Sequence, residues 1–208
     1  MNNRRYHTQF VIPSALTLVM TLLAVVPGWA TSNTFTFNLV RSPALNTAPA
    51  CVSHAAGTVT VQEAGPVQIM HVEVQGLPPN TDFDFFVIQV PNKPFGMSWY
   101  QGDIATNYQG IGHGTFIGRF SIETFVVAPG VTHAPLTFDN AFPSVSPNPE
   151  TGPIQMYHLG LWFNSPDDAE RAGCPDTITP FNGEHDAGVQ VLNTSDFPDL
   201  QGPLIHVQ

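Results

Sequence analysis

The densest run of polar side chains lies at residues 182–186, where Glu184, His185 and Asp186 follow one another. Carboxylate oxygens suit Ca²⁺, and a histidine beside a carboxylate suits Zn²⁺. The chain lacks both the EF-hand loop and the His-Glu-x-x-His pattern, so no recognised metal spacing is met. Two interpretations follow: a Ca²⁺ or Zn²⁺ site at these three residues, or a solvated acidic loop.

A second metal hypothesis uses histidines that lie far apart in the sequence. His113 stands in a Gly-rich turn, His158 in an apolar segment and His185 in the acidic run. A fold that brought them together would offer three imidazoles to Zn²⁺. Their spacing is not diagnostic, and the alternative for His158 is an imidazole hydrogen-bonded in or near the core.

Aromatic side chains beside polar groups form another kind of candidate site. In the run from Trp99 to Asp103, two aromatic rings adjoin polar side chains near a turn, as they do on carbohydrate-binding faces. Trp99 and Tyr100 are therefore candidates for stacking on a ligand. The alternative is that these aromatic residues pack the core.

Short motifs give little support to catalysis. No Gly-x-Ser-x-Gly turn occurs, and the Ser, His and Asp residues follow no order typical of hydrolases. Asn193-Thr194-Ser195 is an N-glycosylation sequon, which matters in a host that glycosylates secreted proteins. The sequence therefore favours a protein that binds over one that catalyses.

Cys51 and Cys174 are the only two cysteines of the chain. Two thiols usually pair when an exported chain meets an oxidising compartment, so we predict a disulfide between them. The alternative is two free thiols or a metal-bound pair. In the chain-entropy model, a disulfide that closes so long a loop stabilises the fold by about 5 kcal/mol.

The first 30 residues have the organisation of a secretory signal peptide. Arg4 and Arg5 precede an apolar stretch at 11–26, and small residues mark a cleavage site after Ala30. The stretch contains Pro13 and is shorter than the ~20 residues that span a bilayer, so we expect no membrane insertion after cleavage. The arginine pair leaves ordinary and twin-arginine export open.

The remaining residues, 31–208, have the length of a single domain. They keep four basic residues against all sixteen acidic ones, a formal charge of 4 minus 16, or −12. Phosphate recognition needs clustered Lys and Arg, so nucleic acid is not an expected partner. Extracellular proteins, glycans and cations remain compatible with this charge.

Alternation of apolar and polar residues predicts an all-β fold. It is clearest at 35–39, 59–61 and 70–74, each bounded by Gly, Pro or Asn. Roughly nine such segments separated by turn signals predict an antiparallel β-sandwich with long loops. Phe83–Val90 and Tyr157–Phe163 are apolar on both faces and should lie centrally in a sheet. Further strands are predicted at 95–104, 114–127, 154–163, 188–192 and 204–207, and a long connection at 128–153.

Residues 165–173 carry the one clear helix signal. Ser165 can cap the N-terminus, Pro166 suits the first turn, and Gly173 can end the helix. We therefore predict a short helical turn inside a loop, directly before Cys174.

Two segments resemble parts of a known class of domain. Val74–Phe83, which contains Gly-Leu-Pro-Pro-Asn-Thr, resembles the turn that joins two strands in secreted bacterial immunoglobulin-like and fibronectin type III-like domains. Gly102–Phe116 resembles a strand, a Gly-rich turn and a strand of the same class. Such domains mostly act as non-catalytic binding, adhesion or spacer modules, so the resemblance implies an immunoglobulin-like fold and no catalytic residues.

These observations predict a secreted, non-catalytic β-sandwich that acts as an extracellular binding, adhesion or matrix module. One alternative is a secreted metal-dependent hydrolase that uses the acidic and His-bearing loops. The other is a carbohydrate-binding module that uses Trp99.

Overall fold

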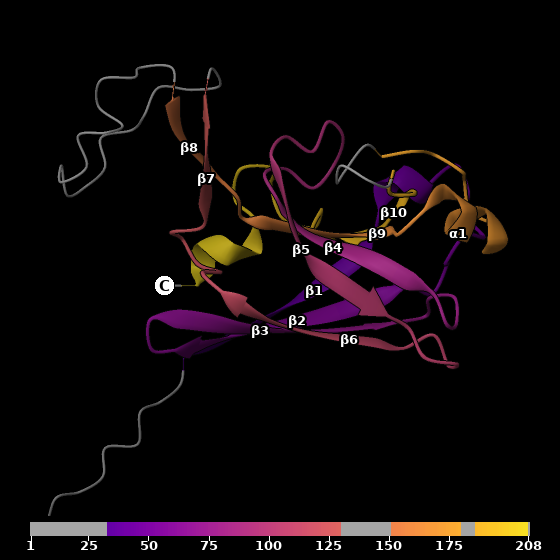
Figure 1. Cartoon of the computed structure of the whole chain (residues 1–208), viewed down its shortest axis with the longest axis horizontal. Helices are drawn as coiled ribbons and strands as arrows, with labels where there is room; N and C mark the ends of the chain where they lie inside the picture. The colour runs from indigo at the N-terminus through magenta and orange to yellow at the C-terminus, as the bar shows by residue number, and fades with distance from the viewer. Residues whose placement is uncertain (1–32, 130–150, 180–185, 208) are drawn as a thin grey trace, which may run out of the picture. The chain divides into compact units, whose positions relative to one another are not determined.

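The computed structural model describes residues 33–129, 151–179 and 186–207, which form mostly antiparallel β structure with little helix (Figure 1). The all-β class predicted from apolar alternation is therefore confirmed. In chain order the elements are β1 (Thr34–Arg41), η1 (Pro43–Leu45), β2 (Ala56–Ala64), β3 (Val67–Gln75), β4 (Asp82–Ile88), β5 (Ser98–Ala105), β6 (Gly112–Gly118), β7 (Phe125–Pro129), β8 (Thr151–Gln155), β9 (His158–Phe163), α1 (Pro166–Arg171), β10 (Gln190–Asn193) and η2 (Pro203–His206).

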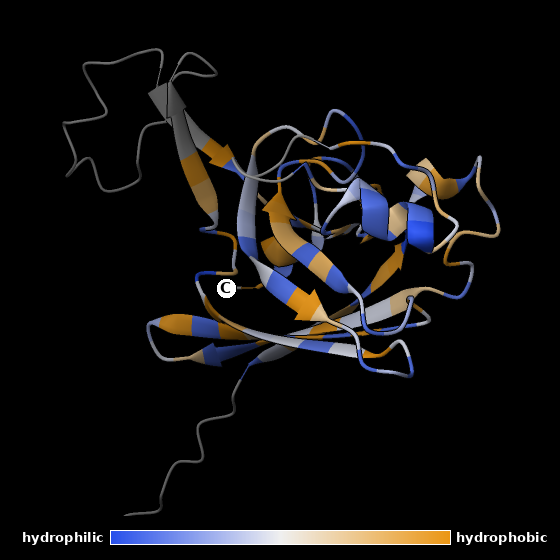
Figure 2. Cartoon of the chain, turned by 45° about the vertical axis from the view of Figure 1, so that its right-hand side comes forward, coloured by the Kyte–Doolittle hydropathy of each residue, from blue (hydrophilic) through white to orange (hydrophobic). Residues whose placement is uncertain are grey.

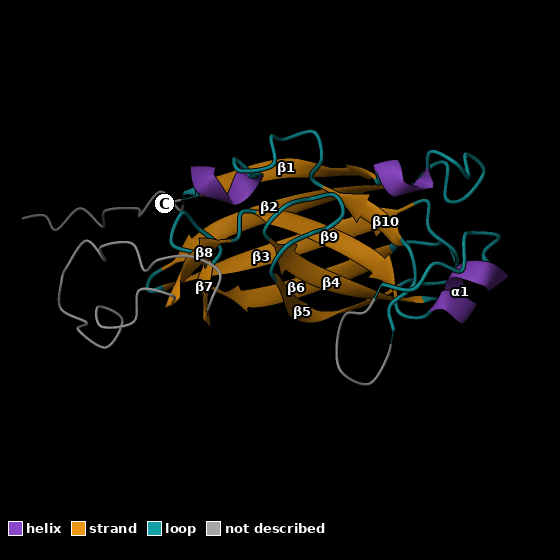
Figure 3. Ribbon diagram, turned by 90° about the horizontal axis from the view of Figure 1, so that it is seen from above, coloured by secondary structure: helices purple, strands orange, loops and turns teal. Residues whose placement is uncertain are grey.

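Eight strands form one sheet in the order β5-β4-β9-β10-β1-β2-β3-β6, and every pairing is antiparallel. β1 pairs with β2 from Thr34 to Leu39, whereas its last two residues pair with β10. Because β1 changes partner along its length, the sheet folds over on itself and its two halves form two layers (Figures 1 and 3). The sheet is nearly closed, with β5 and β6 as its two edge strands.

The core lies between the two layers and follows the alternation of the strands. On β2 and β3 the inward residues, such as Val59, Met70 and Val72, are buried, and the residues between them are more exposed. Figure 2 shows this alternation as apolar and polar bands along the strands. Burial of each such side chain contributes roughly 1.5–3 kcal/mol, so the pattern also fixes which face each strand turns inward.

β4 and β9 both lie inside the sheet with a strand on each side, as predicted for segments that are apolar on both faces, and they pair with each other. All six residues of β9 are buried. One face of these strands packs in the main core, and the other packs in a second cluster of buried side chains. The second cluster comprises Phe86, Ile88, Phe95, Trp162 and Ala187.

The predicted helix and disulfide are both present. Oγ of Ser165 accepts a hydrogen bond from the backbone N–H of Asp168 at 3.2 Å, which caps α1. Gly173 has φ of 71°, the left-handed conformation that commonly ends a helix. Directly afterwards, Cys174 is bonded to Cys51 with a Cα–Cα distance of 4.9 Å. The disulfide ties the segment after α1 to the loop after β1.

One predicted strand is wrong, and two others are divided. The one at 204–207 is instead the 3₁₀ helix η2, in which the N–H of Val207 donates to the carbonyl of Leu204 at 3.1 Å. Pro203 at its start favours this turn because its ring fixes φ near the helical value. The one at 114–127 is divided by a turn into β6 and β7, and the one at 154–163 is divided at 156–157 into the end of β8 and the whole of β9.

β7 and β8 form a separate two-stranded sheet that projects from the main sheet (Figure 1). They occupy the two ends of the connection predicted at 128–153, so this segment begins and ends as strand. Within the described residues, no helix has the length and apolar character needed to cross a membrane.

Candidate functional site

The predicted Ca²⁺ or Zn²⁺ cluster falls mostly outside the described residues. Glu184 and His185 lie there, whereas Asp186 is described and is exposed. Within the described ranges, no group of three or more His, Cys, Asp or Glu side chains is placed to hold a metal. The metal site at these residues remains a prediction.

The histidines of the second metal hypothesis have different surroundings. His185 lies outside the described residues, His113 is exposed on β6, and His158 is fully buried. Nε2 of His158 lies 3.1 Å from the backbone carbonyls of 198–199, and Nδ1 lies 2.8 Å from Oγ1 of Thr194. Burial lowers the pKa of His158, and its hydrogen bonds partly oppose this shift. His158 is therefore the hydrogen-bonded core imidazole that formed the alternative interpretation.

The glycosylation sequon begins at a residue that is buried in the folded protein. Asn193 has no exposed surface, and its Nδ2 donates to the carbonyl of Pro91 at 2.9 Å and to Oε1 of Gln190 at 2.8 Å. A glycan on this nitrogen would have to displace both bonds and reach solvent through packed side chains. The folded domain therefore does not present Asn193 for modification.

Trp99 and Tyr100 lie on opposite faces of β5, because successive side chains of a strand point to opposite sides. Tyr100 packs edge-on against Phe86 of the second cluster, with ring centroids 5.5 Å apart. Trp99 lies opposite Val87 of β4, whose side chain belongs to the main core. The two aromatic residues therefore do not form one stacking surface.

Tyr100 belongs to a polar group that sequence analysis missed. Its hydroxyl donates to Oδ1 of Asp103 at 2.6 Å, and Asp103 lies directly opposite the buried Asp84 of β4. Burial raises the pKa of Tyr100, and the hydrogen bond to Asp103 and the charges of both carboxylates raise it further. Tyr100 therefore stays protonated and acts as a donor. The two acids face each other through the β4–β5 register, which local sequence patterns do not contain.

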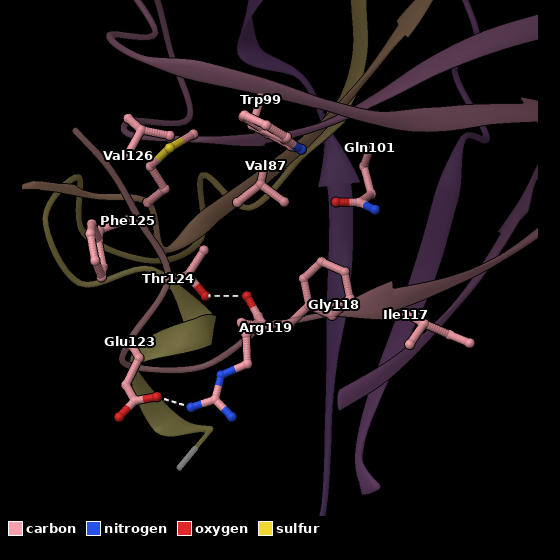
Figure 4. Close-up of a pocket in the computed structure, with 12 residues that line it drawn as sticks. Val87, Trp99, Gln101, Ile117, Gly118, Arg119, Glu123, Thr124, Phe125 and Val126 are labelled. Carbon is pink, nitrogen blue, oxygen red and sulfur yellow. Dashed lines mark hydrogen bonds and ion pairs between the residues drawn. The ribbon is translucent and has the colours of Figure 1, made fainter. Parts of the chain in front are cut away.

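An open pocket of about 700 Å³ lies on the Trp99 side of β5. β5 and β6 meet at a bridge between Thr106 and Gly112 and diverge away from it (Figure 1). We call this line of approach the β5–β6 seam, and the pocket at its open end the seam pocket. Its lining includes Trp99, Gln101, Ile117, Arg119, Glu123 and Phe125 (Figure 4).

β5 supplies the aromatic and amide groups of the seam pocket. The side chain of Trp99 is 59% exposed, although its backbone pairs with Val87 of β4. Gln101 is the extra residue of a β-bulge, because Phe85 pairs with Gly102 and Phe86 pairs with Tyr100. A bulge redirects side chains at a sheet edge. In Figure 4 Trp99 and Gln101 lie on one side of the pocket, and Arg119, Glu123 and Thr124 of the turn after β6 lie on the other.

The turn after β6 supplies the charged rim, and its own hydrogen bonds hold it in place. Oγ1 of Thr124 donates to the carbonyl of Arg119 at 2.7 Å and accepts from the N–H of Ser121 at 2.8 Å. Arg119 forms an ion pair with Glu123 and donates from Nη1 to the carbonyl of Pro66 at 2.7 Å. Both charged side chains therefore already have partners within the protein.

A second hollow, of about 490 Å³, borders Arg41 of β1. The guanidinium donates to the backbone carbonyls of Leu45, Ala48 and Cys51 at 2.9–3.1 Å. Its donors hold the loop that carries one half of the disulfide. We therefore assign Arg41 a structural role and take the seam pocket as the candidate functional site.

The chain matches no protein-family model and no curated protein. The assignment of a site consequently rests on the geometry of the chain itself. Sequence analysis singled out Trp99 but missed Arg119 and Glu123, which line the same pocket. The one local signal for those two is their spacing of four residues, which also occurs in ordinary surface ion pairs.

Proposed function

We propose that this chain is a secreted, non-catalytic module that binds an extracellular partner in the seam pocket. The observation that carries the proposal is the indole of Trp99, 59% exposed, which shares one lining with the ring of Phe125 at 50% exposure. Large apolar side chains gathered at one exposed place typically mark a binding site. Exposed tryptophan is also enriched among residues that dominate binding energy.

The lining favours contact over catalysis. Arg119 and Glu123 are bound to each other, and Gln101 and Thr124 add only an amide and a hydroxyl. The hydroxyl of Thr124 is already engaged by the backbone on both sides. Such groups can orient a ligand but offer no activated nucleophile.

Secretion is supported by two independent observations. The N-terminal 30 residues have the organisation of a signal peptide. The Cys51–Cys174 disulfide is a bond that persists in oxidising compartments such as the extracellular space. Expression of the full precursor in a secreting host should release a protein whose first residue is Thr31, which N-terminal sequencing measures. A product retained in the cell with an intact N-terminus would contradict this part of the proposal.

The binding function can be tested with two variants of the secreted protein on arrays of glycans and extracellular proteins. We expect Trp99→Ala to abolish at least one signal, because it removes the largest exposed side chain of the seam pocket. Tyr108→Ala is the matched control, since Tyr108 is 76% exposed and lies in the turn at the closed end of the seam. Identical signals from both variants, or turnover of any arrayed molecule, would refute the proposal.

A further inference from the structure

We propose that the seam pocket binds a neutral glycan, with one sugar ring stacked on the indole of Trp99. This inference rests on the proposed binding function and names its ligand class. A pyranose has an apolar face of C–H groups and an edge of hydroxyls, so its site needs a flat apolar surface and polar groups beside it. The seam pocket has both.

Trp99 provides the flat apolar surface. It stands across from Val87, and both side chains line the same pocket. β5 pairs with β4 at every residue except the bulged Gln101, so the indole projects from a paired strand rather than from a loop. A tryptophan has only two side-chain torsions, so it offers a large contact area at a low cost in conformational entropy.

The polar edge is formed by Gln101, Arg119 and Glu123. The ion pair uses Nη2 of Arg119 and Oε2 of Glu123, and Nη1 of Arg119 donates to the carbonyl of Pro66. Oε1 of Glu123 and the amide of Gln101 therefore remain available for ligand hydroxyls. A carboxylate accepts from a hydroxyl, and an amide both donates and accepts, which suits the mixed hydrogen-bonding character of sugars.

The charge of the protein selects neutral over acidic sugars. Among the described residues that line the pocket, the one basic side chain, Arg119, is already paired with Glu123. The chain after the predicted cleavage site has a formal charge of −12, from four basic and sixteen acidic residues. An anionic polysaccharide would meet long-range repulsion without a free cation at this lining to bind it. Uncharged oligosaccharides avoid this cost.

Tryptophan fluorescence provides a direct test. After cleavage at Ala30 the chain keeps two tryptophans, Trp99 at 59% and Trp162 at 0% exposure, so an added sugar should perturb the emission of Trp99. We would titrate the secreted protein with neutral cello-, manno-, xylo- and chito-oligosaccharides and with oligogalacturonate. We expect a saturable change with at least one neutral series, a Kd that does not depend on salt concentration, and no response to oligogalacturonate.

Variants locate that response in the pocket. Trp99→Ala removes the probe, so its binding would be followed by calorimetry; we expect the affinity to fall by about tenfold or more, which corresponds to about 1.4 kcal/mol. Trp99→Phe should retain part of the affinity because a smaller flat ring remains. Tyr108→Ala should bind as the parent protein does.

The outcomes separate the glycan from the broader function. Suppose that arrayed proteins bind in a Trp99-dependent way and no neutral oligosaccharide binds. This result would overturn the proposal of a glycan ligand and leave the proposed binding function standing. Tighter binding of oligogalacturonate than of neutral sugars would overturn the preference for uncharged ligands. The absence of any Trp99-dependent binding would overturn both proposals.

Discussion

The two ends of the β5–β6 seam are built from the same pair of strands and differ in how closely the strands approach. At the closed end, Thr106 and Gly112 form a bridge, and the N–H of Leu77 donates to the carbonyl of Gly110 at 3.3 Å. At the open end, Trp99 and Ile117 line a pocket. The two edge strands are therefore in backbone contact at one end of the seam and separated by a pocket at the other.

Between its closed and open ends, the seam is filled by one aromatic side chain. The ring of Phe116 stacks on Phe85 with centroids 5.3 Å apart. A Cβ at Gly102 or Gly114 would lie within 2.9 Å of this ring, so both glycines leave space for it. Phe116 thereby fills the gap between the two edge strands. The seam is closed by backbone at one end, filled by an aromatic ring in the middle, and open at the pocket.

The largest effect is expected from a methyl group at the closed end. In Gly110→Ala the new Cβ would lie 2.0 Å from the carbonyl oxygen of Leu77, at a residue with φ of 73°. We expect the free energy of unfolding to fall by about 3 kcal/mol or more, because a clash with backbone adds to the cost of a left-handed alanine. Urea unfolding measures this change.

Gly65→Ala is the matched control for that substitution. Gly65 has φ of 70°, and an added Cβ would meet no atom within 4 Å, so only the left-handed strain of about 1 kcal/mol should remain. Equal losses in the two variants would show that close approach to Leu77 does not hold the closed end together.

A smaller effect is expected in the middle of the seam. Phe116→Ala removes a half-buried ring, and we expect a loss of about 2 kcal/mol in unfolding free energy, below the range for fully buried phenylalanines. Phe125→Ala is the comparison at the pocket, where the ring is 50% exposed and should cost under about 1 kcal/mol. Equal destabilisation of the two variants in thermal and urea unfolding would contradict the difference we expect between the middle of the seam and the pocket.

Much of this fold could be predicted from local patterns. Neighbouring residues alone predict the alternation in β2 and β3, the two-sided apolar character of β4 and β9, and the capping serine of α1. The disulfide follows from the number of cysteines, because the chain has only two. η2 was mistaken for a strand because Leu204 to Val207 contain apolar residues, while the decisive signal was the proline before them.

The candidate site was only half predictable, because it is made by two strands and a turn that meet through the sheet order. Alternation alone places Trp99 and Tyr100 on opposite faces, so their separation could have been inferred. The placement of Trp99 in one pocket with Arg119 and Glu123 could not be inferred from the sequence. It requires β5 and β6 to be the two edges of one nearly closed sheet. The facing carboxylates of Asp84 and Asp103 likewise depend on register.

The smallest change in stability is expected at the open end itself. Ile117 is 67% exposed, so Ile117→Thr removes little buried surface and keeps a β-branched side chain suited to a strand. We expect the free energy of unfolding to stay within about 0.5 kcal/mol of the parent protein, because the side chain lies on the outer face of β6. Urea unfolding measures this quantity. A loss of stability as large as that of Phe116→Ala would mean that the open end is packed like the rest of the seam, and that the pocket is part of the core rather than a surface kept for a ligand.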